Sequence, residues 1–197
     1  MKTKAILISL IGVLAITTTV FQACKKTEEN INQPPTSGTF TDPRDGQTYE
    51  TVEIGSQTWF AVNLNYNTGD SWCYDNNGSN CDIYGRLYTW EAATSACPDG
   101  WHLPNDIEWT TLIDFLGGED VAGGKMKETG TTHWNSPNTG ATNSSGFTAL
   151  PGGYRNTNGG FYNGGSLGYW WSATEYSSTT AWYRALGYGN GRVGRGN

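Results

Sequence analysis

The residues that could carry out catalysis are few and widely spaced along the 197-residue chain. Ser172, His102 and Asp106 supply the residue types of a catalytic triad, and His133 is the only other histidine. Ser172 follows two tryptophans and does not lie in the GxSxG turn that exposes a nucleophilic serine. His102 stands between a tryptophan and a leucine, so we expect a packed, hydrogen-bonded core histidine. Nothing in the spacing brings the three residues together.

Three glutamates could act as general acids or bases, but none is marked out for that role. Glu108 is expected to cap a helix, Glu175 to end a strand, and Glu91 to lie in a short helix. The HExxH, paired-histidine and CxxC patterns of zinc sites do not occur in the sequence. We therefore expect no catalytic residue and no cofactor.

The turn-rich loop 70–82 is a candidate calcium site. Asp75, Asn77 and Asp82 offer the oxygen ligands that Ca²⁺ prefers, together with Ser79. The position at which an EF-hand would supply its bidentate glutamate is Arg86. A solvated polar loop is the simpler interpretation.

The four cysteines divide into one near the N-terminus and three in the body of the chain. Cys73, Cys81 and Cys97 allow three different single bridges. Because Cys73 and Cys81 bound the same polar loop, we favour that pair, which leaves Cys97 unpaired. A redox role for Cys97 lacks a second cysteine at CxxC spacing.

The first 23 residues have the pattern of an export signal. Lys2 and Lys4 precede an apolar run, 5–20, which is shorter than the roughly 20 residues of a membrane-spanning helix. Ala23-Cys24 after this run resembles the lipobox of bacterial lipoproteins. That resemblance implies cleavage before Cys24, acylation of Cys24 by chains such as palmitate, and anchoring at the outer membrane or cell surface, facing the periplasm or the exterior.

Residues 24–39 read as a flexible tether, because they are polar and contain Pro34-Pro35 without apolar periodicity. The rest of the chain, 40–197, is predicted to form one domain. The net charge is −6 and the basic residues are scattered, which argues against nucleic-acid binding. Nine tryptophans and 27 glycines indicate many turns around an aromatic core.

The predicted elements are short. Runs 49–54 and 57–63 are strands joined by a Gly55-Ser56 turn. A first helix is expected over 87–96. A second begins after Asn105, with apolar residues at i, i+3, i+4 and i+7, and stops at Gly117-Gly118. Further strands are expected at 146–150, 169–173 and 181–186, within a long irregular region.

Aromatic residues beside Asn and Gly in this irregular region could stack on sugars, with the 152–169 loop as the expected ligand surface. The alternative is that they form a small core for the loops themselves. If Trp170 and Trp171 lie in a strand they face opposite sides, so one is expected in the core and the other more exposed. The candidate ligand surface consists of Trp134, Tyr154, Phe161, Tyr162 and Tyr169.

Five runs occur in an order that resembles the Fibrobacter succinogenes major paralogous domain: GSQTWFAVNLN, YGRLYTWEAA, CPDGWHLPNDIEWTTL, SGFTALPGGYR and GYWWSATE. The resemblance covers about 40–190 and implies secreted or lipid-anchored proteins. It also implies an α+β, C-type lectin-like fold with two helices, small antiparallel sheets and a long irregular loop region. Relatives continue into a final strand resembling GFSVRC, which would bring a partner for Cys97; here it is expected to be missing, so the domain is expected to be C-terminally truncated.

The expected function is therefore a lipid-anchored, non-catalytic surface domain that binds a glycan or an extracellular protein. An extracellular enzyme acting on a polymer or protein is one alternative, by fold analogy. A structural surface protein, or a decayed copy without a ligand, is the other.

Overall fold

The computed structural model describes residues 37–178 and 180–197. The predicted leader, the Cys24 lipidation site and most of the predicted tether lie outside the described residues. The first strand begins at Ser37, inside the range predicted as tether. Within the part of the chain that is described, no helix has both the length and the apolar character needed to cross a bilayer.

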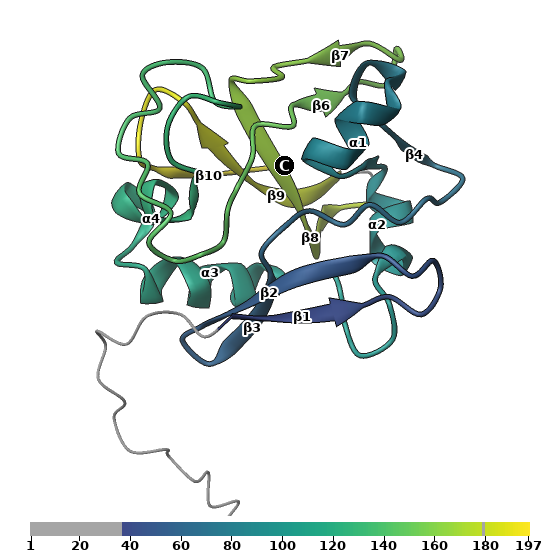
Figure 1. Cartoon of the computed structure of the whole chain (residues 1–197), viewed down its shortest axis with the longest axis horizontal. Coiled ribbons are helices and arrows are strands. Elements are labelled where there is room, and N and C mark those ends of the chain that lie inside the picture. The colour runs from purple at the N-terminus through teal and green to yellow at the C-terminus, as the bar shows by residue number, and fades with distance from the viewer. Residues whose placement is uncertain (1–36, 179) are drawn as a thin grey trace, which may run out of the picture. The chain divides into compact units, whose positions relative to one another are not determined.

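An N-terminal three-stranded antiparallel sheet opens the domain (Figure 1). It is formed by β1 (Ser37–Thr41), β2 (Thr48–Ile54) and β3 (Gln57–Phe60), in the order β1-β2-β3. Ile54 pairs with Gln57 across the turn, and Gly55 there has a φ of 63°, which glycine adopts without strain. The predicted hairpin is confirmed.

The segment predicted as an irregular cystine loop contains regular structure. Strand β4 (Ser71–Trp72) pairs with β5 (Leu87–Tyr88), and between them lie the 3₁₀ helix η1 (Tyr74–Asn76) and helix α1 (Gly78–Tyr84). Asn77 caps α1 by accepting a hydrogen bond from the Ser79 N–H at 3.1 Å. The Cys73–Cys81 disulfide is present, as predicted, and ties η1 to α1.

Both predicted helices form, but two more accompany them in the described residues. Helix α2 (Trp90–Ala96) begins later than predicted, because the first two residues of the predicted range belong to β5. Thr89 caps the helix. Helix α3 (Asp106–Phe115) has the expected capping box between Asn105 and Glu108. Besides α1, helix α4 (Glu119–Met126) was not predicted, since two of its residues are glycines with poor helix propensity.

The C-terminal half consists of strands and turns. Strand β6 (Tyr154–Arg155) pairs with β7 (Phe161–Tyr162), and β8 (Leu167–Ser177), β9 (Thr180–Gly187) and β10 (Val193–Gly196) form a sheet in the order β10-β9-β8. Strands were correctly predicted near 169–173 and 181–186. The predicted strand at 146–150 is wrong, because only a single bridge from Ala149 to Lys127 forms there.

A strand follows β9, but it is not the GFSVRC-like strand that the resemblance implies, so the absence of that strand stays a prediction. Strand β10 pairs with β9, with Val193 opposite Leu186. It lacks the GFSVRC sequence, and in the described sheets it pairs with β9 and not with β1.

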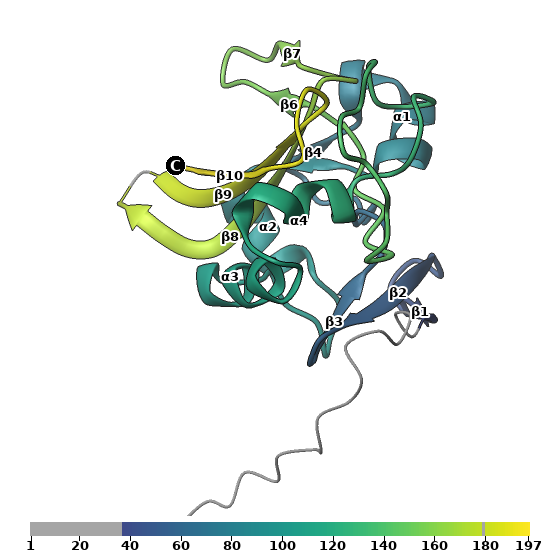
Figure 2. The same cartoon turned by 90° about the vertical axis from the view of Figure 1, so that its left-hand side faces the viewer.

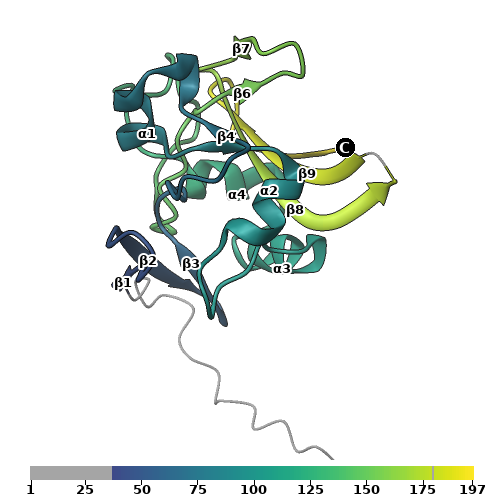
Figure 3. The same ribbon diagram turned by 90° about the vertical axis from the view of Figure 1, so that its right-hand side faces the viewer.

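One hydrophobic core joins these elements into an α+β domain, as predicted. Figure 2 shows α3 and α4 against the β8–β9–β10 sheet, with the β1–β2–β3 sheet on their other side, and Figure 3 shows α2 beside β8 from the opposite direction. The core draws on both sheets and both helices: Val52, Trp59, Trp109, Leu112, Met126, Leu186 and Val193 are all buried in one cluster.

Candidate ligand-binding cleft

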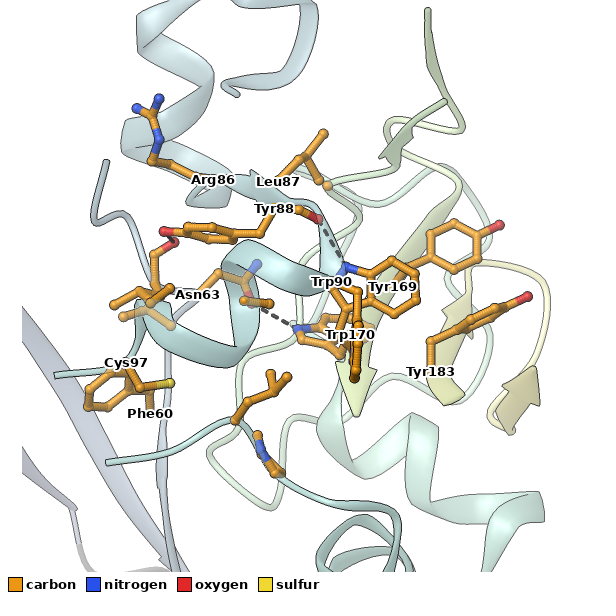
Figure 4. A pocket seen from close by; sticks show the side chains of 18 of the residues that line it. Phe60, Asn63, Arg86, Leu87, Tyr88, Trp90, Cys97, Tyr169, Trp170 and Tyr183 are labelled. Atoms are coloured by element: carbon orange, nitrogen blue, oxygen red, sulfur yellow. Dashed lines mark hydrogen bonds between the residues drawn. The ribbon is translucent and has the colours of Figure 1, made fainter. Parts of the chain in front are cut away.

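A cleft of about 1250 Å³ opens between β3, α2, β6 and β8. Its lining includes many aromatic side chains, which is the usual character of small-molecule and glycan sites. Figure 4 shows Phe60 and Cys97 at one end of the cleft, Trp90 and Trp170 in the middle, and Tyr169 and Tyr183 at the other end.

Tryptophan N–H groups fix the middle of the cleft. Trp170 donates to Asn63 Oδ1 at 2.8 Å (Figure 4), and Trp171 donates to the Tyr88 carbonyl at 2.9 Å. Trp90 donates to the Ser172 carbonyl at 2.8 Å. These bonds attach β8 to α2, to β5 and to the segment after β3, so partly buried polar contacts hold the cleft walls in place.

Trp170 and Trp171 point to opposite sides of β8, as predicted. Trp170 packs against the hydrophobic core beside Phe147, whereas Trp171 faces Tyr183. Both are half-buried, so the expected difference in exposure between them is not found. Helix α2 and strand β5 cover the side of β8 that Trp171 occupies.

At the outer end, four tyrosines form what we call the tyrosine cluster: Tyr154, Tyr162, Tyr169 and Tyr183. The ring of Tyr154 stacks on Tyr162 at 5.5 Å and meets the edge of Tyr169 at 5.4 Å. Tyr169 in turn meets Tyr183 at 5.7 Å. Burial raises the pKa of Tyr169, which also accepts a hydrogen bond from Asn163. The cluster therefore places several phenol rings in mutual contact, and the polar residues Asn156 and Thr157 line the same cleft.

Only part of the predicted aromatic surface lies at the cleft. Tyr154 and Tyr169 line it, while Tyr162 and Phe161 lie next to it on β7, where Phe161 packs against Tyr74 at 5.4 Å. Trp134 was predicted wrongly: it is 1% exposed and donates to the Ala149 carbonyl inside the core. The region around it is poor in aliphatic residues, so an aromatic ring fills the interior.

The inner end of the cleft is bounded by the free edge of β3. Ala61 N–H bonds to the Glu50 carbonyl, so by the antiparallel alternation the main-chain groups of Thr58 and Phe60 point away from β2. No described residue pairs with them, and the buried Trp59 Nε1 also has no acceptor. Cys97 lines this end as a free thiol, as expected, and burial raises its pKa in spite of nearby Arg44.

The residues of the hypothetical triad have separate partners. His102 was expected in the core, but its side chain is 70% exposed and contacts Glu108 at 2.9 Å. Ser172 is fully buried and accepts from the Thr174 N–H, and Asp106 pairs with Arg184 at 2.7 Å. Burial opposes ionisation of Asp106, but its hydrogen bonds from Arg195 and Arg184 lower its pKa.

The carboxylates proposed for acid–base roles are also occupied or exposed. Glu108 accepts from the Asn105 N–H at 2.8 Å, as predicted for the helix cap. Burial opposes ionisation of the Glu108 carboxyl, but the hydrogen bonds from the Asn105 N–H and from His102 lower its pKa below the ordinary value. Glu91 lies in the first turn of α2 and Glu175 in β8, and both are exposed.

The calcium candidates occupy two helical turns instead of one open loop. Asp75 lies in η1, Asn77 uses its side-chain oxygen to cap α1, and Asp82 lies on the exposed side of α1. Across residues 37–178 and 180–197, no three His, Cys, Asp or Glu side chains gather as a metal site would require.

Sequence reasoning missed Arg155 and the free edge of β3. Arg155 lines the cleft with its guanidinium carbon 4.1 Å from the centre of the Trp72 ring. In the YRNTNGGFY run, a turn-forming NTNGG segment separates Tyr154-Arg155 from Phe161-Tyr162. This pattern could have indicated a hairpin that carries Arg155.

Comparison with known proteins agrees with the order of motifs. The model of the Fibrobacter succinogenes major domain matches residues 52–197. Neither the curated proteins nor the solved structures gave a match. Since the match covers most of the chain and includes every element from within β2 to β10, this protein belongs to the Fibrobacter succinogenes major domain family.

Proposed function

We propose that this domain is a non-catalytic binding module that holds a glycan against the tyrosine cluster. The observation that carries the proposal is the position of Tyr154, Tyr169 and Tyr183 at the open end of a large cleft, beside Asn156 and Thr157. The C–H faces of sugars pack on flat aromatic rings, and amide and hydroxyl groups at the rim can bond sugar hydroxyls.

The test is glycan binding by the full-length chain. We expect a soluble oligosaccharide identified on a glycan array to bind Tyr154→Ala and Tyr169→Ala about fivefold more weakly, since each loses roughly 1 kcal/mol of aromatic contact. Isothermal titration calorimetry measures the loss.

Tyr176→Ala is the matched control, because Tyr176 is an exposed tyrosine of β8 that meets the Trp182 ring edge to face and does not line the cleft. Unchanged affinity in both cleft variants, or no glycan bound by the wild type, contradicts the proposal. The second result would leave a structural protein or a decayed copy without a ligand.

A non-catalytic role is supported by the engagement of the ionisable residues. Ser172, His102 and Asp106 each have partners elsewhere, and Glu108 serves a helix cap. The alternative, an extracellular enzyme, predicts products when the bound glycan or a protein substrate is incubated with the full-length chain. Chromatography of the incubated substrate decides between the two.

The proposal includes a lipid anchor on Cys24 and display at the outer membrane or cell surface. It is supported by the charged start, the apolar run of 5–20 and Ala23 directly before Cys24. Mass spectrometry of the intact chain from its native host should give a protein that starts at Cys24 and carries acyl chains. An uncleaved leader, or an unmodified Cys24, contradicts it.

A protein partner is a second candidate, favoured by the free edge of β3. An extended segment could add to β3 through the unpaired main-chain groups of Thr58 and Phe60. Such a segment would cover Cys97, so an added peptide that binds in this way should slow the alkylation of Cys97. Thr58→Pro removes one outward N–H and should abolish the protection; protection that survives this variant, or none with any peptide, rejects strand addition.

A further inference from the structure

We propose that the glycan bound at the tyrosine cluster is acidic, and that a carboxylate or sulfate group of the glycan binds Arg155. This inference rests on the proposed function and names the chemical class of its ligand. It is carried by the surroundings of Arg155, by the charges that line the cleft and by the geometry of β6.

Among the arginines of the described residues, Arg155 is the one for which no hydrogen-bond acceptor or carboxylate partner is found. It makes cation–π contacts only, with the Trp72 ring at 4.1 Å and the Phe161 ring at 5.8 Å. Its Nε is buried and has no hydrogen-bond partner. Four other arginines pair with carboxylates: Arg44 with Asp42, Arg184 and Arg195 with Asp106, and Arg192 with Asp120. Arg86 donates instead to Ser71.

Arginine stacked on aromatic rings is well suited to bind an oxyanion. The planar guanidinium offers N–H donors along its edge, and the rings beneath it fix its orientation and keep water from one face. Carboxylate and sulfate oxygens are the acceptors that match this fork. A neutral sugar would leave the charge of Arg155 without a counter-ion.

The charges of the cleft support an anionic ligand. Among the described residues that line it, Glu108 is the one carboxylate, and it is engaged by His102 and by the Asn105 N–H. The chain as a whole carries −6, so a cleft with a free arginine and no free carboxylate departs from the rest of the surface. An acidic glycan is repelled elsewhere and attracted here.

The geometry of β6 indicates that the ligand is an oligosaccharide. Tyr154 and Arg155 are neighbours in a strand, so their side chains leave β6 on opposite sides. Tyr154 meets the tyrosine cluster, whereas Arg155 meets Trp72, and both line the cleft. A chain of sugars that crosses β6 can therefore stack one residue on Tyr154 and direct the acidic group of another to Arg155.

Matched pairs of oligosaccharides test the inference with the full-length chain. One pair is an oligogalacturonate and its methyl ester, and the other is a sulfated galactan oligosaccharide and its desulfated form. We expect the acidic member of at least one pair to bind about tenfold or more tightly than its neutral partner, because a charge-assisted hydrogen bond is gained. The pair that shows the difference identifies the oxyanion as a carboxylate or a sulfate.

Variants connect this preference to Arg155. Arg155→Gln should reduce the acidic-to-neutral ratio to about one and leave the affinity for the neutral member unchanged, while Arg155→Lys should keep part of the preference. Arg192→Gln is the control, since Arg192 is exposed and does not line the cleft. Thermal unfolding confirms that each variant is folded.

Two outcomes overturn the inference and can be told apart. If acidic and neutral members bind equally, or if Arg155→Gln keeps the preference, the glycan proposal stands and the acidic ligand is rejected. If no oligosaccharide of either kind binds, this inference is rejected, and the glycan array decides separately whether the proposed function fails as well.

Discussion

At the scale of single residues, Lys127 holds the irregular part of the domain together. Its side chain is fully buried, and its ammonium group donates to the carbonyls of Thr139, Gly187 and Asn190 at 2.8 to 3.0 Å. It also lies 5.3 Å from the Trp134 ring. One side chain therefore satisfies three carbonyls from two separate segments, the loop at Thr139 and the turn that follows β9.

The pKa of Lys127 predicts how stability changes with pH. Burial lowers this pKa from 10.5 to about 8, so between these values the unfolded chain binds a proton that the folded chain has released. The free energy of unfolding should therefore gain from this group as pH rises from about 8 to about 9.5. Chemical denaturation at a series of pH values measures the change.

Lys127→Met provides the reference for that measurement. The variant lacks the Lys127 amine but keeps every other group that titrates at high pH, including the tyrosines. The variant should be less stable at pH 7 by roughly 2–4 kcal/mol, since three buried carbonyls lose their donor. The difference between wild type and variant should widen above pH 8. A constant difference up to pH 9.5 would mean that the pKa of Lys127 is not lowered.

At the scale of elements, helix α4 is held by close backbone contact and not by helix propensity. A Cβ on Gly124 would come within 2.4 Å of the Gly140 carbonyl oxygen, and the Gly124 N–H donates to the Gly191 carbonyl at 2.9 Å. The two glycines of α4 therefore let two loops approach its backbone directly.

Gly124→Ala should destabilise the domain by roughly 1–3 kcal/mol, because the added methyl separates α4 from the loop at Gly140. Thermal or urea-induced unfolding measures the loss. Gly78→Ala in helix α1 is the matched control: open space surrounds its Cβ position, so this substitution should be neutral or slightly stabilising. Equal effects of the two substitutions would show that close approach is not the reason for glycine in α4.

At the scale of the whole molecule, the single core predicts cooperative unfolding of the domain. Val52 in β2 and Val193 in β10 belong to the same buried cluster as α3 and α4. A fragment of residues 37–197 should therefore show one transition, with the same midpoint by tryptophan fluorescence and by circular dichroism. Separate midpoints would mean that the β1–β2–β3 sheet unfolds apart from the β8–β9–β10 sheet.

Local sequence signals were reliable where the structural role of a residue depends on its near neighbours in the chain. Asn105 and Glu108 form the predicted capping box, Gly55 turns the hairpin, and Cys73 bonds Cys81 across a short span. Reasoning of the same kind failed for α4, whose glycines are explained only by the loops that touch them. It also failed for Trp134 and His102, whose burial depends on which distant segments cover them.

For the same reason, only part of the candidate site could be predicted from the sequence. Tyr154 and Tyr169 could be singled out because aromatic residues beside Asn and Gly suggest a sugar surface. Arg155 could not be assigned a role, because its contact with Trp72 of β4 and its buried Nε without a hydrogen-bond partner appear only in the folded chain.

The sequence by itself determined the family, the capped helix, the first hairpin and the disulfide, because these depend on neighbouring residues or on the order of motifs. Only the tertiary structure decided where the cleft lies, which tyrosines meet across it and which charges remain unpaired. Those properties depend on contacts between segments far apart in the chain. The ring of Tyr154 meets Tyr169 of β8, and Arg155 meets Trp72 of β4, only after folding has brought β6 next to both strands.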